Sequence, residues 1–292
     1  MSMRISTWIL IIILLSACVP QRTPRSPTLP FDLRTTATEA PLFVATVLPS
    51  FAPSPMVSLT VSPTITSTTA IASICSPIAG FNRSELEAAI SNPFHPPKRA
   101  GSDDPHQAID LAVTESGISL DGVPVNLLLG GRVAAVISDR FPYGNALLVE
   151  TSLDDMPDEW EGQIDVPTPA PTLGPHPSLT CPKMDIPNSW DFTQRSLYLL
   201  YAHLADTPLH QLDEIVSCGE QIGEIGMSGN ALNPHLHLEA RVGPRMASFE
   251  SIAHYETRAA PEEMWAYCTW RVSGIFQLLD PINLLNLVSD GD

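Results

Sequence analysis

The stretch "PHLHLE" (234–239) brings together residue types that can do chemistry. Alternate residues of a strand share a face, so His235, His237 and Glu239 are expected to point the same way. Paired imidazoles on one face suit a metal, a proton relay or both, because neutral histidine is a common zinc ligand and the usual acid–base group near neutral pH. An isolated HxH pair is explained equally well by two surface histidines.

Two further stretches strengthen the metal hypothesis. "DDPHQAIDLAV" supplies His106 and, four residues later, Asp110, and "LYLLYAHL" ends an apolar run with His203. One carboxylate and two imidazoles would make three zinc ligands and leave a fourth position for water. A buried histidine that is not a ligand needs a polar partner. The fold must therefore bring the three stretches together in space.

The elements that could position these residues are mostly strands. Short apolar runs separated by Gly, Asn and Pro turns predict an antiparallel, mainly β domain with few short helices. Ser84 and Glu87 fit a capping box at the start of a short helix, and "DPINLLNLV" predicts a closing helix. The expected strands are 107–113, 123–129, 131–138, 145–151, 195–204 and 235–242.

The first quarter of the chain does not resemble a folded domain. Residues 1–18 resemble a bacterial lipoprotein signal, in which Cys18 carries a lipid and becomes the first residue of the mature protein. An ordinary secretory signal or an uncleaved anchor is the alternative. Residues 19–73 are rich in Pro, Thr and Ser and predict a disordered linker. The folded domain is expected at 74–292, outside the cytoplasm and held at the membrane by the lipid.

The charge of the chain is concentrated in this expected domain. The whole chain carries a formal charge of −17, and residues 1–73 carry +2, so residues 74–292 carry −19. Such a domain repels nucleic acid and anionic lipid surfaces. Neutral or cationic partners are expected instead.

Four cysteines follow Cys18, and none of them forms a CxxC pair, which argues against a cysteine-based zinc site. In an oxidising compartment, an even number favours two disulfides with three possible pairings. We prefer Cys75–Cys268, which would join the ends of the domain, and Cys181–Cys218, which would pin a loop.

A long acidic, proline-rich segment (152–194) interrupts two expected strands. It has no helical or strand periodicity, so it predicts a surface loop inserted in a hairpin. Loops of this length are often functional. We expect this one to roof or rim a cleft.

Four motifs are spread along the expected domain: "HQAID" (106–110), "YAHL" (201–204), "GEQIGEIGMSGNALNPHLHLE" (219–239) and "LDPINLL" (279–285). In type and order they resemble those of the LytM/lysostaphin-type zinc endopeptidases, which cut peptide bonds in bacterial cell-wall peptidoglycan. The resemblance covers about residues 95–290 and implies the duplicated-hybrid-motif fold and peptidoglycan peptides as substrate.

The resemblance also implies roles for individual residues. His106, Asp110 and His237 match the zinc ligands. His235 and His203 match two histidines that act on the water or steady the transition state. We assign His235 to the water and His203 to the oxyanion, and the two roles could be exchanged.

The chain departs from the family pattern at two positions. Ala108 stands where the family usually has glycine, which is harmless if its φ is negative. Asn233 replaces a frequent glycine, and asparagine tolerates left-handed conformations.

Glu239 is expected either to orient a ligand or to be an exposed strand residue. Two other functions stay open: a non-catalytic relative that binds peptidoglycan or regulates a hydrolase, and a secreted peptidase for other peptides.

Overall fold

The computed structural model describes residues 73–287, apart from residues 100, 114–116, 161 and 169–178. Everything below belongs to the compact unit Thr64–Asp292. The predicted signal (1–18), Cys18 and the predicted linker up to residue 72 lie outside the described residues. No helix in the described part is both long and apolar enough to cross a membrane.

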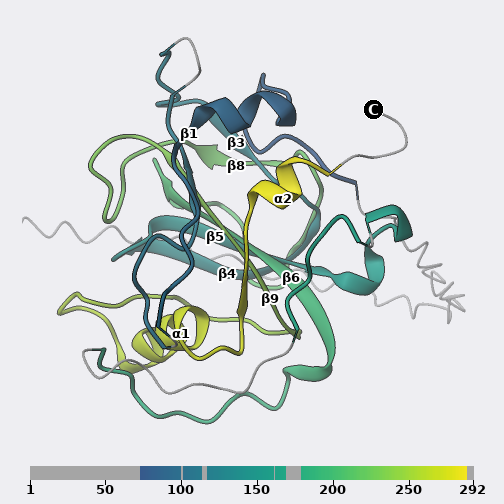
Figure 1. The fold of residues 1–292 in the computed structure, drawn as a ribbon. Helices are drawn as coiled ribbons and strands as arrows, with labels where there is room; N and C mark the ends of the chain where they lie inside the picture. The colour runs from purple at the N-terminus through teal and green to yellow at the C-terminus, as the bar shows by residue number, and fades with distance from the viewer. Residues whose placement is uncertain (1–72, 100, 114–116, 161, 169–178, 288–292) are drawn as a thin grey trace, which may run out of the picture. The chain divides into compact units, whose positions relative to one another are not determined.

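One large antiparallel sheet dominates the domain, in the order β1-β2-β9-β6-β5-β4-β7, with β10 also paired to β9 (Figure 1). A separate antiparallel pair joins β3 and β8. The predicted fold class, mainly antiparallel β with few short helices, is confirmed. The strands are β1 (Ile90–Asn92), β2 (Ile109–Leu111), β3 (Pro124–Asn126), β4 (Gly131–Arg140), β5 (Gly144–Ser152), β6 (Asp191–Leu204), β7 (Ile215–Val216), β8 (Gln221–Glu224), β9 (Leu236–Arg245) and β10 (Gln277–Leu279).

All six expected strands are present, although β2 and β3 are shorter than predicted. The other four, β1, β7, β8 and β10, have only two to four residues. Stretches this short are below the length at which alternation of apolar and polar residues can be recognised. Their pairing therefore depends on neighbouring strands rather than on their own sequence.

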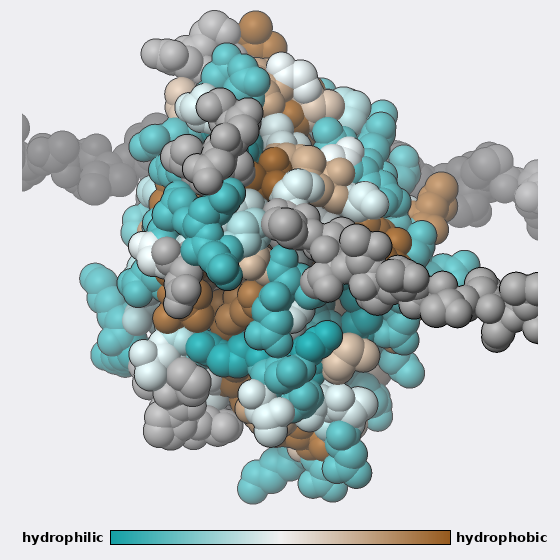
Figure 2. Space-filling view, turned by 90° about the vertical axis from the view of Figure 1, so that its right-hand side faces the viewer, coloured by the Kyte–Doolittle hydropathy of each residue, from teal (hydrophilic) through white to brown (hydrophobic). Residues whose placement is uncertain are grey.

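From residue 196 to its end at 204, strand β6 is buried on both faces, which explains the nearly continuous apolar sequence of this stretch. Leu197, Leu199 and Tyr201 pack into one cluster, called here the first core, on one side of the sheet. Tyr198 and Leu200 pack into a second core on the other side. Figure 1 shows α1 on one side of the sheet and the β3–β8 pair with the first helix on the other. Most large apolar side chains lie inside, and hydrophilic groups predominate on the face drawn in Figure 2.

The first helix is a 3-10 helix, η1 (Arg83–Ala89), and its cap differs from the prediction. The residue before the helix is Asn82, whose N–H donates to Glu85 Oε2 at 2.8 Å, so the capping pair is Asn82 and Glu85. The predicted pair, Ser84 and Glu87, is wrong by two residues. Both pairs have the same spacing and acceptable residue types, so the sequence alone does not separate them.

The remaining helices are η2 (Leu153–Asp155), η3 (Asp158–Trp160), α1 (Pro261–Arg271) and α2 (Ile282–Leu285). The predicted closing helix exists as the short α2. Helix α1 was not predicted. It begins with proline, which suits the first position of a helix, and five consecutive residues at its end, Ala266–Trp270, are buried. Burial all round leaves no amphipathic stripe for a sequence pattern to reveal.

The two expected disulfides are present, but the preferred pairing is wrong. The bonds are Cys75–Cys218 and Cys181–Cys268, instead of Cys75–Cys268 and Cys181–Cys218. The cause is topological, because the segments around Cys75 and Cys218 both run beside residues 127–129. The N–H of Cys75 donates to Leu128 O at 2.9 Å, and the N–H of Gly219 donates to Leu127 O at 2.8 Å.

The acidic segment joins β5 to β6 as an insertion in a hairpin, as expected. Its described residues include buried anchors, among them Trp160 and Trp190. Trp190 packs against Phe249 in the second core with ring centroids 5.4 Å apart. Cys181 ties the segment to Cys268 of α1. The described part of the insertion therefore packs against the domain.

Candidate active site

Strands β2 and β9 bring the upstream and downstream stretches together. Asp110 lies opposite His237 in the antiparallel register, so both side chains project from the same face. His237 Nδ1 lies 2.9 Å from Asp110 Oδ1. His106, just before β2, places its Nε2 2.9 Å from the same oxygen and 3.3 Å from His237 Nδ1. Three predicted ligands separated by up to 131 residues thus meet at one point.

The donor set fits zinc. With zinc–nitrogen bonds of 2.0–2.1 Å, neighbouring ligand atoms of a tetrahedral site lie about 3.3 Å apart, close to the distances between these atoms. The opposite ring nitrogens have acceptors: His106 Nδ1 lies 3.1 Å from Pro93 O, and His237 Nε2 lies 3.2 Å from Glu239 Oε1. With protons on His106 Nδ1 and His237 Nε2, which face these acceptors, His106 Nε2 and His237 Nδ1 would present lone pairs to a cation beside Asp110. Without a cation, protons on His106 Nε2 and His237 Nδ1 bond to the Asp110 carboxylate. A cation is the group that such a cluster accepts.

The ionisation of the cluster supports the same conclusion. Burial would raise the pKa of Asp110, but hydrogen bonds and charges from His106 and His237 hold that pKa far below its usual range. Burial also opposes protonation of His237, yet Asp110 and Glu239 outweigh it and raise the pKa of His237 in the metal-free protein. A metal at this point therefore competes with a proton on His237.

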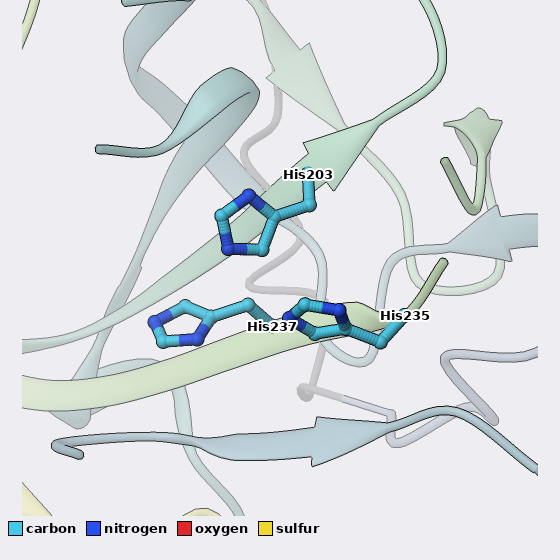
Figure 3. A group of neighbouring side chains, drawn as sticks. All are labelled: His203, His235 and His237. Atoms are coloured by element: carbon cyan, nitrogen blue, oxygen red, sulfur yellow. The ribbon is translucent and has the colours of Figure 1, made fainter. Parts of the chain in front are cut away.

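His203 ends β6 beside the cluster, and its ring turns toward His235 and His237 (Figure 3). The ring centroids of His203 and His235 are 4.7 Å apart. His203 has a positive φ of 64°, a backbone conformation that is uncommon outside glycine and that concentrates at functional sites. Its Nδ1 donates to Ser228 O at 2.7 Å, which leaves Nε2 as an acceptor. Burial, with His237 and His235 nearby, lowers the pKa of His203 to about 3, so this ring is neutral at pH 7.

The ring of His235, just before β9, is held by a backbone carbonyl in the same way as the ring of His203. Its Nδ1 donates to Asn233 O at 2.8 Å, and its Nε2 lies 3.5 Å from Asp110 Oδ1. His235 and His203 therefore both direct an Nε2 lone pair away from their carbonyl partners. His203, His235 and His237 also form a second possible metal triad within 4.8 Å, like His106, Asp110 and His237. Of these two triads, the one with Asp110 contains a negative charge to offset that of a cation.

Glu239 is fully buried behind His237, so the alternative of an exposed strand glutamate is wrong. The carboxylate accepts hydrogen bonds on both oxygens. Burial alone would raise the pKa of Glu239, but Arg271 and Arg241 lower it well below its usual value. Strand alternation places Arg241 on this face, whereas nothing in the sequence pattern pointed to the other donors. The four donors to the Glu239 carboxylate are Tyr143 (2.9 Å), Trp270 (2.8 Å), Arg241 (3.0 Å) and Arg271 (2.5 Å).

The five predicted residues lie on the wall of an open cleft of about 520 Å³. No described residue of the insertion lines this cleft, so the expectation that the insertion roofs or rims it is wrong for the described part. The insertion is bonded instead to α1, through Cys268. The cleft is also lined by apolar Phe141, Pro142 and Leu232, and by Asp103, Asp104 and Tyr255.

The structure accommodates the residues at both positions where the sequence departs from the family pattern. Ala108 is buried, and its φ is not positive, so its Cβ is accommodated as expected. Asn233 does not adopt a left-handed conformation either, so that tolerance is not what makes it acceptable here. Its backbone carbonyl, which any residue would supply, holds His235 Nδ1.

No family model and no curated protein matches this chain. The solved structures to which this chain is similar include the catalytic domain of lysostaphin from Staphylococcus simulans (13% identity, TM-score 0.36, covering 71% of this chain and 98% of that one). A variant of the catalytic domain of a prophage-encoded M23 protein from Enterococcus faecalis matches at 16% identity and TM-score 0.31, over 55% of this chain and 85% of that one. A zinc-containing peptidase from Vibrio cholerae matches at 24% identity and TM-score 0.31, over 58% of this chain but only 38% of that one.

Proposed function

We propose that this protein is a zinc-dependent endopeptidase that hydrolyses peptide bonds of bacterial cell-wall peptidoglycan, in a cross-link or a stem peptide. The observation that carries the proposal is the convergence of His106 Nε2, Asp110 Oδ1 and His237 Nδ1 within 3.3 Å at an open cleft. The four motifs that resemble LytM/lysostaphin-type enzymes support the choice of substrate.

His106, Asp110 and His237 would hold the zinc, which when bound supplies a Lewis acid that polarises a carbonyl and activates water. The role of the neighbouring imidazoles follows from their free Nε2 atoms. His235 Nε2 accepts a proton from the water, and the carboxylate of Asp110, 3.5 Å away, stabilises the resulting imidazolium. His203 is neutral at rest and can donate to the developing oxyanion only when its Nε2 carries a proton. The reverse division of labour is the alternative.

The cleft favours an uncharged or cationic peptide. Asp103 and Asp104 line it, and the single arginine among its lining residues, Arg271, is occupied by Glu239 and by Asp103 O. A carboxylate-rich wall attracts amino groups and repels acids. This character agrees with peptidoglycan stem peptides that carry free amines, and it disfavours acidic protein segments.

The decisive experiment compares wild type with His237→Ala. We expect wild type to retain about one zinc per chain and to release peptides from purified cell wall, and the variant to lose both, because it lacks one of three ligands. His95→Ala is the matched control, since His95 is exposed and outside the cleft. Equal peptide release by wild type and His237→Ala would reject the proposal.

Experiments on the same purified protein distinguish the proposed function from two alternative functions. A non-catalytic peptidoglycan-binding or hydrolase-regulating relative would bind zinc and cut no peptide. The complete set of predicted residues argues against it. A peptidase for other secreted peptides would cut casein or oligoglycine in preference to a wall digest.

We also propose that the domain works outside the cytoplasm, anchored by a lipid on Cys18. The two disulfides support an oxidising compartment. Detergent phase separation of the full-length protein tests the anchor. Recovery of the wild-type protein only in the aqueous phase would contradict it.

A further inference from the structure

Two consecutive residues at the end of α1 hold the carboxylate that meets a proposed zinc ligand. Trp270 Nε1 donates to Glu239 Oε2 at 2.8 Å, and Arg271 Nη1 donates to Glu239 Oε1 at 2.5 Å. The same Oε1 is the acceptor of His237 Nε2, at 3.2 Å. The chain of contacts therefore runs from helix α1 to the metal cluster through one carboxylate.

The carboxylate has no freedom to turn, because different groups hold its two oxygens. Arg241 Nη2 donates to Oε2 at 3.0 Å, on the side of Trp270. Tyr143 donates to Oε1 at 2.9 Å, on the side of Arg271. Glu239 itself is completely buried, so water cannot replace a lost donor without opening the core. The direction of Oε1, and with it the orientation of the His237 ring, depends on these donors.

Arg241 also reaches the upstream part of the site, because its Nη2 donates to Gln107 Oε1 at 2.5 Å. Arg271 reaches the same part through a backbone carbonyl. Its Nη2 donates to Asp103 O at 2.7 Å, in the loop that leads to His106. Among the described donors to Glu239, Arg271 thus combines a bond to Oε1, the acceptor of His237 Nε2, with a bond to the backbone of the segment that carries His106, whereas Arg241 bonds to Oε2. A planar guanidinium suits this double contact, because its donors point in fixed directions.

We infer that Arg271 of α1 is a positioning residue for the metal centre, which sets the His237 ring through Glu239 and the His106 loop through Asp103 O. The inference rests on the proposed zinc site and adds an element, α1, to it. Arg271 has no hydrogen bond to any of the three proposed metal ligands and acts through its acceptors, which are Glu239 Oε1, Asp103 O and the hydroxyl of Tyr143.

A purely structural role for Arg271 makes a different prediction. If it only balanced the buried charge of Glu239, its loss would lower the free energy of unfolding and leave zinc affinity in the folded protein unchanged. Arg241 already binds Glu239, through the other oxygen, so charge balance does not require Arg271 to contact Oε1. Zinc affinity and ligand geometry are therefore the informative measurements.

The experiment measures zinc affinity of the full-length protein by competition with a chromophoric chelator, and the absorption spectrum of the cobalt-substituted protein. We expect Arg271→Gln to bind zinc at least about tenfold more weakly and to alter the cobalt spectrum, with partial rescue in Arg271→Lys. The matched control is Arg140→Gln. Arg140 donates to Glu263 of the same helix at 2.7 Å and has no contact with Glu239. It should bind zinc like wild type.

Trp270→Phe keeps the inference falsifiable if Arg271→Gln fails to fold, because it removes the indole donor to Glu239 Oε2, keeps an aromatic ring in the core and leaves both arginines in place. We expect a several-fold loss of zinc affinity. Wild-type affinity and an unchanged cobalt spectrum in Arg271→Lys and Trp270→Phe, or in a folded Arg271→Gln, would overturn the inference and leave the zinc site standing. A wild-type protein that binds no zinc would instead overturn the proposed function.

Discussion

The two faces of strand β9 are equally buried and opposite in chemistry. On one face Leu236 and Leu238 are completely covered in the first core, and on the other His235 and His237 are exposed by only 8% and 7%. Apolar side chains need only volume to pack against, whereas each buried polar atom needs a partner. Burial alone therefore does not distinguish a core from a site, and the network of partners does.

The difference extends to the adjoining strands. Behind the apolar face, Ile109 of β2 and Tyr201 of β6 lie opposite Leu238 and continue the same core. On the polar face Asp110 lies opposite His237 and continues the site. On β2 and β9 the apolar core and the site residues thus lie on opposite faces, whereas β6 contributes apolar side chains to a core on each face. Substitutions on the two faces should have separable effects.

The largest effect is expected from Asp110→Asn on the polar face. The variant keeps the shape of the side chain but removes the negative charge that two imidazoles surround. We expect hydrolysis of wall peptides to fall at least about a thousandfold, because loss of the metal removes several kcal/mol of transition-state stabilisation. Zinc content and peptide release, measured beside near-ultraviolet circular dichroism, test this. A folded variant with normal turnover would contradict the assignment of Asp110.

On the apolar face, Leu238→Ala should act on stability. Removing a completely buried leucine leaves a cavity, and we expect the free energy of unfolding to fall by about 2–5 kcal/mol. Zinc affinity of the folded variant should stay within about twofold of wild type. Urea unfolding and chelator competition measure the two quantities. A large loss of zinc affinity with little loss of stability would erase the contrast between the faces.

The smallest effect concerns the rim of the cleft. Burial would raise the pKa of Asp103, but hydrogen bonds from Tyr255 and Tyr267 and the charge of Arg271 outweigh it and lower that pKa. A lowered pKa stabilises the fold above the unfolded value of about 3.9, and this stabilisation is lost as the pH falls through the folded value. Tyr255→Phe removes one donor, at 2.6 Å from Asp103 Oδ2.

We therefore expect the free energy of unfolding of Tyr255→Phe to be lower than that of wild type by about 0.5–1.5 kcal/mol at pH 6. This difference should become smaller below about pH 4. Urea unfolding at a series of pH values measures it. If the difference in the free energy of unfolding between wild type and Tyr255→Phe were the same at pH 3 and pH 6, the Tyr255 hydroxyl would not act through the Asp103 carboxylate. Tyr267→Phe, which removes the other tyrosine donor to Asp103, should show the same narrowing.

Much of the strand framework follows from the sequence, because alternation and turn residues are local. The HxH spacing places His235 and His237 on one face, and the approach of His106 and Asp110 follows once β2 pairs with β9. The identity of that partner strand is not a local property. The resemblance of motifs implied only that His106, Asp110 and His237 share a metal, and the β2–β9 register in the structure brings Asp110 opposite His237.

Other features depend on tertiary structure and could not be predicted. The disulfide pairing follows from which segments run beside residues 127–129. Helix α1 is buried all round its last turns and so lacks a periodic stripe. The positive φ of His203 is imposed by the contacts of its own backbone, where its N–H donates to Tyr143 O and its carbonyl accepts from Gly226. Trp270 and Arg271 belong to α1, so their place near the site could not be predicted without that helix.

The pairing of Cys75 with Cys218 has a consequence for the integrity of the chain. A backbone cut anywhere between Ser152 and Cys181 produces two fragments, with Cys75 in the first and Cys218 in the second. The fragments remain covalently joined, so a nicked molecule migrates as one species until a reductant separates it into two. His106 and Asp110 would then belong to one polypeptide and His237 to the other, with a single sulfur–sulfur bond keeping the two halves of the centre in one molecule.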